Sequence, residues 1–132
     1  MSPSVRILVV DDMPAVRLII RNMLEEAGFT QVIEAEDGEA AWKLIRNAVS
    51  APPEHQIHVV ICDWNMPGMT GIDLLRAVRG SAHTRELPFL MITGEGNPAL
   101  HEEAAAAGVT DFVVKPFSSA QLSEQVSRLL GR

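Results

Sequence analysis

Short runs of branched apolar residues alternate along the chain with segments in which apolar residues recur every three or four positions. This alternation predicts strands connected through helices, and such strands lie parallel in one sheet with helices on both faces. Five apolar runs have strand length, and they cover residues 7–10, 32–35, 57–62, 87–92 and 112–114. We therefore expect an α/β fold in which five helices flank a doubly wound, five-stranded parallel sheet.

Residues that favour helix ends mark the segments between these strands. Pro14 suits the first turn of a helix, where its missing N–H is not needed, and Gly28 suits the position after that helix ends. Ser118 and Gln121 have the spacing of a capping box at the start of the last helix. Two adjacent prolines cannot continue a helix, so residues 50–54 are predicted to form a loop.

Length and charge narrow the class of protein. The 132 residues are typical of one domain, and the single cysteine, Cys62, excludes an internal disulfide. Seventeen acidic and 11 basic residues give a net charge of −6, whereas nucleic-acid-binding proteins carry basic surfaces. The apolar runs are far shorter than the roughly 20 residues of a membrane span, and residues 1–6 are too short and polar for a signal peptide. We expect a cytoplasmic monomer that binds neither nucleic acid nor a membrane.

Polar residues with distinctive chemistry stand where the predicted strands end. Asp11 and Asp12 follow the first strand, Asp63 the third, Thr93 the fourth and Lys115 the fifth. Ligands of doubly wound sheets bind at this carboxyl edge, at the point where the strand order reverses. We take the order 2-1-3-4-5, which is common in such sheets and makes strands one and three neighbours at the reversal. Three carboxylates then share one crevice with a hydroxyl and an ammonium group.

The crowding of these carboxylates has an electrostatic consequence. Two like charges about 4 Å apart repel by roughly 4 kcal/mol at an effective dielectric constant near 20. The cluster must therefore raise a carboxyl pKa or bind a cation. Oxygen ligands without neighbouring histidine or thiolate suit Mg²⁺, for which Mn²⁺ can substitute. A carboxylate beside such an ion can act as a nucleophile toward a phosphoryl group, whose oxygens Lys115 would neutralise.

Four segments of the chain resemble response-regulator receiver domains, and they occur in the order and spacing of that family. They are Ile-Leu-Val-Val-Asp-Asp at 7–12, Asp-Trp-Asn-Met-Pro-Gly-Met-Thr-Gly at 63–71, Met-Ile-Thr at 91–93 and Phe-Val-Val-Lys-Pro-Phe at 112–117. The second and fourth segments look particularly like those of single-domain chemotaxis regulators. The resemblance implies a flavodoxin-like fold and a single receiver domain over residues 1–132 with no output domain.

The resemblance also assigns roles to the acidic residues. By similarity, Asp63 is the phosphoacceptor, which takes a phosphoryl group from the phosphohistidine of a histidine kinase. Asp12 would ligate Mg²⁺ directly and Asp11 mainly through water, while Asp63 and the backbone carbonyl of Asn65 would complete the protein ligands. The chain would then be no enzyme with a separate substrate, because its phosphoryl chemistry takes place on its own aspartate.

The remaining roles concern the phosphoryl group and the signal. By similarity, Thr93 would hydrogen-bond the phosphoryl group and Lys115 would pair with it. Asn65 and Glu95 match the positions that tune hydrolysis. Phe112 occupies the position of an aromatic switch residue that turns inward on activation, although it lacks the hydroxyl of a tyrosine. The signal would leave through the face formed by the fourth helix, the fifth strand and the fifth helix.

Several functions are compatible with these residues. Within the receiver class, we favour control of the flagellar motor switch in chemotaxis over a phosphorelay receiver that passes its phosphoryl group to a histidine phosphotransfer protein. An aspartyl-phosphate phosphatase of the haloacid-dehalogenase type uses the same residue types, but such enzymes carry Asp-x-Asp after the first strand, whereas Asp11 and Asp12 are adjacent. A flavodoxin-like carrier would need a phosphate-binding loop where these two acids stand.

Overall fold

The computed structural model describes residues 5–64, 66, 68–94 and 98–131, and within them five strands form one parallel sheet. The strand order is β2-β1-β3-β4-β5, so the expected reversal lies between β1 and β3. The strands are β1 (Arg6–Val10), β2 (Gln31–Ala35), β3 (Val59–Asp63), β4 (Phe89–Thr93) and β5 (Asp111–Val114). The predicted doubly wound topology is confirmed.

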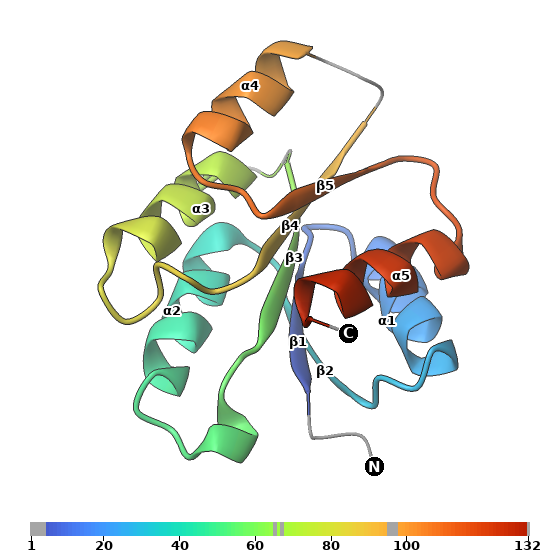
Figure 1. Cartoon of the computed structure of the whole chain (residues 1–132), viewed down its shortest axis with the longest axis horizontal. Coiled ribbons are helices and arrows are strands. Elements are labelled where there is room, and N and C mark those ends of the chain that lie inside the picture. Colours follow the sequence, from blue (N-terminus) through green and yellow to red (C-terminus); the bar gives the residue numbers. More distant parts are fainter. Residues whose placement is uncertain (1–4, 65, 67, 95–97, 132) are drawn as a thin grey trace.

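Five α-helices in the described residues cover the two faces of the sheet. They are α1 (Pro14–Glu26), α2 (Gly38–Ala48), α3 (Gly71–Gly80), α4 (Pro98–Ala106) and α5 (Ser119–Leu129). Figure 1 shows α1 and α5 on one side of the sheet and α2 and α3 on the other, with α4 above them. Within the described ranges, no helix combines the length and the apolar character that crossing a membrane requires.

The core consists of two apolar layers, one on each face of the sheet. Successive side chains of a strand point to opposite faces, so each central strand contributes to both layers. Ile7 and Val9 of β1 pack with the helices α1 and α5, whereas Leu8 and Val10 pack with α2 and α3. Cys62 belongs to the second layer and is fully buried, so burial raises the pKa of its thiol well above the ordinary value. The thiol is therefore unreactive, as its place in an apolar run predicts.

Two strands begin later than the apolar runs suggest. Residues 57–62 and 87–92 were expected to be strands, but β3 begins at Val59 and β4 at Phe89. Pro88 has no N–H to donate to a neighbouring strand, which explains the start of β4. Its carbonyl still accepts the N–H of Val60 at 2.9 Å, so the chain runs alongside β3 before the regular pairing starts.

The same two strands also extend one residue further at their carboxyl ends. Trp64 donates its N–H to the carbonyl of Ile92, and Lys115 donates its N–H to the carbonyl of Thr93, each at 2.9 Å. These bonds continue the ladder, so Asp63 and Thr93 are the last residues of β3 and β4 rather than the first residues of loops. Both side chains are consequently held by the sheet.

The predicted helix ends are confirmed. The helix α1 begins at Pro14, and Gly28 follows its end with a φ of +96°, a conformation that favours glycine. At α5 the capping box is complete, because the N–H of Gln121 donates to the Ser118 hydroxyl and the Gln121 side chain accepts the Ser118 N–H. Residues 50–54 lie outside the α-helices, and a short 3₁₀ helix covers Pro53–His55.

Candidate functional site: an acidic cluster at the carboxyl edge of the sheet

The carboxylates of Asp11, Asp12 and Asp63 lie close together at the carboxyl edge of the sheet, as predicted. Asp11 and Asp12 follow β1, and Asp63 ends β3, the strand that pairs directly with β1. One carboxylate oxygen from each residue lies within 4.8 Å of the other two. Asp11 is 1% exposed and Asp63 is 8% exposed, whereas Asp12 faces solvent. The cluster therefore has two buried members and one accessible member.

Lys115 brings a positive charge to this cluster. It follows β5, two strands away from Asp63, and its backbone N–H donates to the carbonyl of Thr93 on the strand between them. The Lys115 Nζ reaches to 3.4 Å from Oδ1 of Asp63. Its side chain is 42% exposed, so the ammonium group lies at the mouth of the site. Lysine and aspartate thus face a common open crevice, which is lined by Asp12, Met13, Asp63, Trp64, Gly94 and Lys115.

Asp11 has one carboxylate oxygen that is hydrogen-bonded and one that is buried without a partner among the described residues. Its Oδ1 accepts the N–H of Met13 at 2.9 Å, and Oδ2 is the buried oxygen. Burial is the main cause that raises the pKa of Asp11, and the charges of Asp63 and Asp12 raise it further, while Met13 and Lys115 lower it. The described residues therefore do not offset the full cost of burying a negative charge on Asp11.

These observations fit a divalent cation. An orphaned, buried carboxylate oxygen beside two further carboxylates offers an all-oxygen ligand set, which suits Mg²⁺ or Mn²⁺. The residues that would hold the ion are Asp11, Asp12 and Asp63. Asn65, the expected backbone ligand, and Glu95, the expected tuning residue, lie outside the described residues.

The backbone of Asp63 is packed tightly against the start of α3. A Cβ atom on Gly71 would lie 2.6 Å from the carbonyl oxygen of Asp63 and 2.9 Å from the sulfur of Met91. The approach to the backbone carbonyl is too close for any residue with a side chain. Gly71 also donates its N–H to the carbonyl of Trp64 at 3.1 Å. The loop after β3 is thereby closed onto the strand end, which fixes the position of the acid.

Thr93 is oriented differently from the other predicted site residues. It is 2% exposed, and its hydroxyl lies 3.4 Å from Nε2 of His101 on α4. The His101 ring in turn stacks on the ring of Phe112, with 4.4 Å between the ring centroids. The sequence assigns His101 no role, because the four histidines of the chain share no metal-ligand spacing. Only the packing of α4 over β4 and β5 brings these three side chains together.

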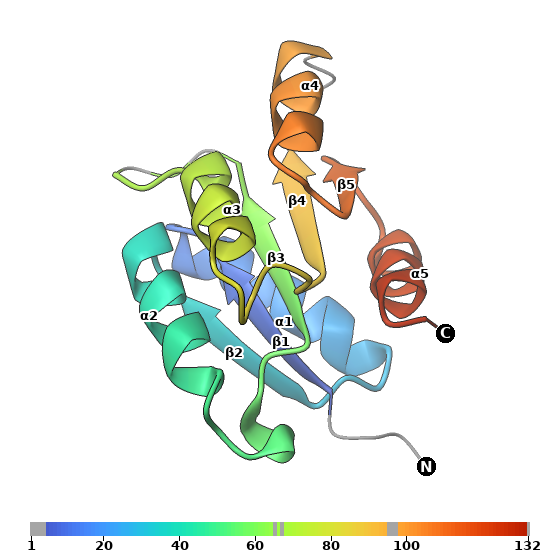
Figure 2. The ribbon, with the colours of Figure 1, turned by 60° about the vertical axis from the view of Figure 1, so that its left-hand side comes forward.

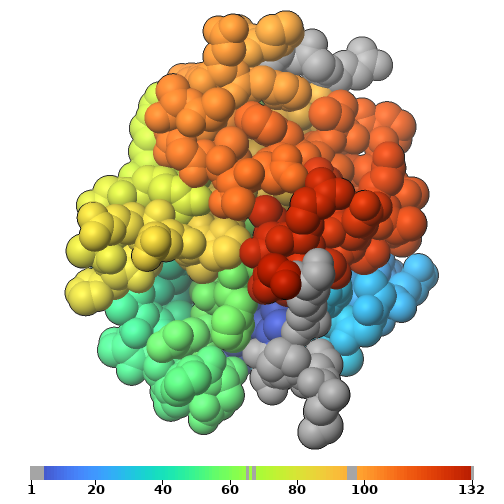
Figure 3. Space-filling view, in the orientation of Figure 1, coloured from blue at the N-terminus to red at the C-terminus, as the bar shows by residue number. Residues whose placement is uncertain are grey.

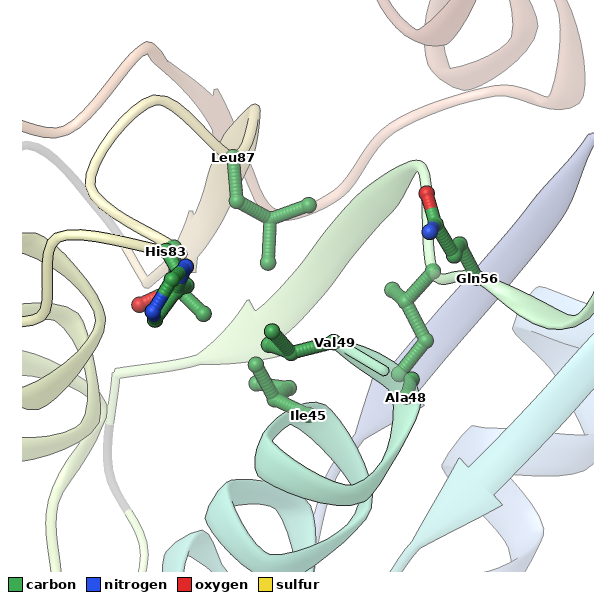
Figure 4. Close-up of a pocket in the computed structure, with 8 residues that line it drawn as sticks. Ile45, Ala48, Val49, Gln56, His83 and Leu87 are labelled. Atoms are coloured by element: carbon green, nitrogen blue, oxygen red, sulfur yellow. The ribbon is translucent and has the colours of Figure 1, made fainter. Parts of the chain in front are cut away.

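A second cavity, of about 220 Å³, lies at the opposite edge of the sheet. Figure 4 shows Leu87 and Ile45 on opposite walls of this cavity, with His83 and Gln56 at its sides. The remaining lining residues are Ala48, Val49, Ile57 and Thr84. These eight described residues include no carboxylate and no lysine, so this cavity lacks the acid and ammonium groups that line the crevice at the carboxyl edge.

Comparison with known proteins agrees with this geometry. The family of response regulator receiver domains matches residues 7–127. The chain belongs to this family. It is 43% identical over 127 residues to the chemotaxis protein CheY of Pseudomonas aeruginosa, a match that covers 96% of this chain and 97% of that protein. The chemotaxis protein CheY1 of Helicobacter pylori has the same identity and coverage.

Solved structures show the same likeness in three dimensions. The chemotaxis protein CheY4 of Vibrio cholerae superposes with a TM-score of 0.83 at 34% identity, covering 95% of this chain and 98% of that chain. A putative response regulator from Chloroflexus aurantiacus superposes with a TM-score of 0.84 at 32% identity, covering 96% and 98%. The family membership favours a two-component signalling receiver over the phosphatase and the flavin carrier that share parts of its chemistry.

Proposed function

We propose that this receiver domain is phosphorylated on Asp63 by a histidine kinase in a Mg²⁺-dependent reaction, and that it signals by protein contact in chemotaxis. The observation that carries the proposal is the meeting of three carboxylates within 4.8 Å of one another, with Lys115 3.4 Å from Asp63. An acid held at a strand end, open to a crevice and flanked by a cation, has the arrangement that phosphoryl transfer requires.

In the proposed reaction, an oxygen of Asp63 attacks the phosphorus atom of a phosphohistidine. A P–O bond forms as the P–N bond breaks, and the electron pair returns to the imidazole nitrogen of the kinase. Lys115 stands within reach of the phosphoryl oxygens and opposes their added negative charge. Thr93 would donate its hydroxyl to one of these oxygens once its side chain turns from α4 toward the site. Hydrolysis reverses the modification, when a water oxygen attacks phosphorus and the P–O bond to Asp63 breaks.

The proposed metal ligands are Asp11, Asp12, Asp63 and the backbone carbonyl of Asn65. A bound Mg²⁺ would neutralise phosphoryl oxygens and relieve the repulsion among the acids. The chain itself supplies the carboxylates, and the buried Oδ2 of Asp11 has no hydrogen-bond partner among the described residues that would compete with a cation. Asn65 and Glu95 remain the residues proposed to tune hydrolysis of the acyl phosphate.

The proposed output surface is formed by α4, β5 and α5. Figure 3 shows these elements, coloured orange to red, as one continuous surface on one side of the molecule. This surface includes a groove between β5 and α5 that is lined by Phe112, Phe117, Gln121, Gln125 and Arg128 among others. The names of the relatives support chemotaxis, so we propose the flagellar motor switch as the target and the cytoplasm as the place of action. A phosphorelay partner is the alternative.

The proposal is tested with a small phosphodonor. The whole chain is incubated with acetyl phosphate, with and without Mg²⁺, and its intact mass is measured. We expect one added phosphoryl group in the wild type with metal and none in Asp63→Asn. Asp73→Asn is the matched control, because Asp73 is an exposed aspartate on α3 whose replacement keeps an oxygen to accept the Thr70 N–H. Full labelling of Asp63→Asn, or labelling of the wild type without metal, would contradict the proposal.

The target is tested separately. The phosphorylated chain is mixed with a flagellar motor switch protein and with a histidine phosphotransfer domain. We expect the phosphorylated chain to bind the motor switch protein more tightly than the unphosphorylated chain does, and to keep its phosphoryl label in the presence of the phosphotransfer domain. Rapid transfer of the label to the phosphotransfer domain would establish the phosphorelay alternative instead.

A further inference from the structure

The helix α4 is attached to the rest of the domain by few buried side chains. Of its residues, all of which are described, Ala104 alone is buried. Glu103 forms an ion pair with Arg76 of α3 at 3.3 Å, but both side chains are about half exposed, and such pairs contribute little. His101 adds contacts with two strands of the sheet, through Thr93 on β4 and Phe112 on β5. The contacts of His101 therefore tie this helix to β4 and β5.

His101 joins two residues that belong to different parts of the proposed mechanism. Its Nε2 lies 3.4 Å from the hydroxyl of Thr93, the buried last residue of β4. Its ring stacks on Phe112, with a ring-centroid separation of 4.4 Å and an angle of 21° between the planes. Such stacking is worth more than the burial of the two rings alone. His101 thus contacts the strand that carries the site and the strand that carries the output surface.

The contacts continue from Phe112 to α5. The side chain of Gln125 donates to the carbonyl of Phe112 at 2.7 Å, and its Nε2 also lies 3.4 Å from Oδ2 of Asp111. The chain of contacts is therefore Thr93, His101, Phe112 and Gln125, one residue each from β4, α4, β5 and α5. Phe112 has no hydroxyl, so it cannot hydrogen-bond Thr93 itself. The imidazole of His101 supplies the polar atom that the phenyl ring lacks.

We propose that His101 is a positioning residue that holds Thr93 and Phe112 in the unphosphorylated arrangement and releases both on phosphorylation. The proposal rests on the proposed phosphorylation of Asp63. Turning the Thr93 side chain toward a phosphoryl oxygen moves its hydroxyl away from Nε2 of His101, so the 3.4 Å contact between them is lost. Without that contact, the His101 ring and the Phe112 ring stacked on it are free to take new positions. The state of Asp63 thereby reaches the α4–β5–α5 surface.

The size of the effect follows from the contact that is exchanged. A typical hydrogen bond inside a protein changes the ratio of two conformers by about fivefold. Removing it with His101→Leu should therefore raise the population in which Thr93 is free, and with it the rate of labelling by acetyl phosphate, by about fivefold. His101→Gln keeps a polar group that can contact Thr93, so it should restore a rate within about twofold of the wild type.

The experiment combines these rates with NMR signals of the histidine rings. Labelling of the whole chain with acetyl phosphate and Mg²⁺ should shift the His101 ring resonances and leave those of His55 and His83 unchanged. These two histidines precede β3 and β4 at the amino edge of the sheet, so they serve as internal controls. His83→Leu is the matched variant, and its labelling rate should equal that of the wild type.

The outcomes separate the two proposals. Labelling of Asp63 with unchanged His101 resonances, or an unchanged labelling rate in His101→Leu, would overturn the role of His101 while phosphorylation stands. A wild type that gains no mass would overturn the proposed function, and the role of His101 with it. Thr93→Val without phosphodonor adds a direct check, because loss of the hydroxyl must shift the His101 resonances if the contact exists in solution.

Discussion

At the carboxyl edge of the sheet, three acids crowd around an unsatisfied oxygen of Asp11. At the amino edge, Thr84 and Arg79 have partners for their polar groups, and Nε of Arg6 is the one buried side-chain atom without a partner among the described residues there. Thr84, 5% exposed, donates its hydroxyl to the carbonyl of Val78 at 2.6 Å. Arg79 donates to the carbonyls of Leu87 and Gly108, each at 2.7 Å. In Figure 2 the arrowheads of β3 and β4 point upward, so the acidic site lies at the top of that view and the amino edge at the bottom.

This difference separates the part of the molecule that holds the fold from the part that binds. A buried polar group with a partner contributes to stability, while one without a partner lowers it unless a ligand supplies the missing interaction. Asp11 is of the second kind, because its Oδ2 is buried without a partner among the described residues. Replacing Asp11 at the carboxyl edge should therefore raise the metal-free stability, whereas replacing Thr84 at the amino edge should lower it.

The largest effect is expected at the amino end of β4. Phe89 is fully buried, and Phe89→Ala removes most of a large core side chain. We expect the free energy of unfolding to fall by about 3–5 kcal/mol, measured by urea denaturation. Leu18→Ala is the control, because Leu18 is 55% exposed and its loss should change stability by less than about 0.5 kcal/mol.

The same variant tests whether the two edges are independent. At a temperature where Phe89→Ala remains folded, it should still gain stability from Mg²⁺, because the acids lie at the other end of the strands. A variant that folds but no longer responds to Mg²⁺ would show that the packing of the amino edge sets the geometry of the site.

The next effect has the opposite sign. We expect Asp11→Asn to raise the metal-free stability at pH 7 by about 1–3 kcal/mol, the usual cost of an unsatisfied buried polar group. The asparagine oxygen can still accept the Met13 N–H, and its amide can donate to the neighbouring carboxylates. The variant should lose most of the stabilisation that Mg²⁺ gives the wild type. Thermal unfolding with and without Mg²⁺ measures both changes.

The pH dependence of this gain follows from the raised pKa of Asp11. The folded state holds the Asp11 proton more tightly than the unfolded state, so the wild type loses stability as pH rises through the folded-state pKa. Below the ordinary value of 3.8, both states are protonated and wild type and Asp11→Asn should differ little. The difference should grow as the pH is raised to 7. A difference that shrinks instead would show that Asp11 is compensated in solution.

Much of the fold could be predicted from the sequence because its signals are local. The apolar runs locate all five strands, and Pro14, Gly28 and Ser118 mark helix ends through their own backbone chemistry. The strand ends were less predictable, because they depend on pairing with other strands. Trp64 and Lys115 extend β3 and β4 through bonds to partners that lie more than 20 residues away.

The part of the site that follows from local sequence signals could also be predicted, whereas the part that depends on packing between elements could not. A parallel sheet places all its carboxyl ends at one edge, so residues that follow strands must come together, as Asp11, Asp12 and Asp63 do. His101 lies inside a helix, and its contacts depend on how α4 packs on the sheet. No sequence pattern encodes that packing, so the contact with Thr93 and Phe112 emerged only from the structure.

A smaller loss is expected at the amino edge when one satisfied polar group is removed. Thr84→Val keeps the shape of the side chain but removes the hydroxyl that donates to the carbonyl of Val78. We expect the free energy of unfolding to fall by about 1 kcal/mol. Thr84→Ser keeps the hydroxyl and is the matched control, and it should retain the hydrogen bond. Equal losses in the two variants would attribute the effect to packing instead of the bond.

The smallest effect is expected for an acid of the carboxyl half that already has partners. The Glu34 carboxylate on β2 forms ion pairs with Nε of Arg17 and Nε of Arg21, each at 2.9 Å. Its side chain is 31% exposed. Glu34→Gln keeps an acceptor oxygen but loses the charge, so we expect a loss below about 1 kcal/mol. The loss should shrink further in 1 M salt, where the screening length is about 3 Å. The contrary outcome is that Glu34→Gln stabilises the protein, as Asp11→Asn is expected to do. That result would show that the summed negative charge of this half of the molecule lowers its stability. The burial of Asp11 would then not be needed to explain the gain in Asp11→Asn.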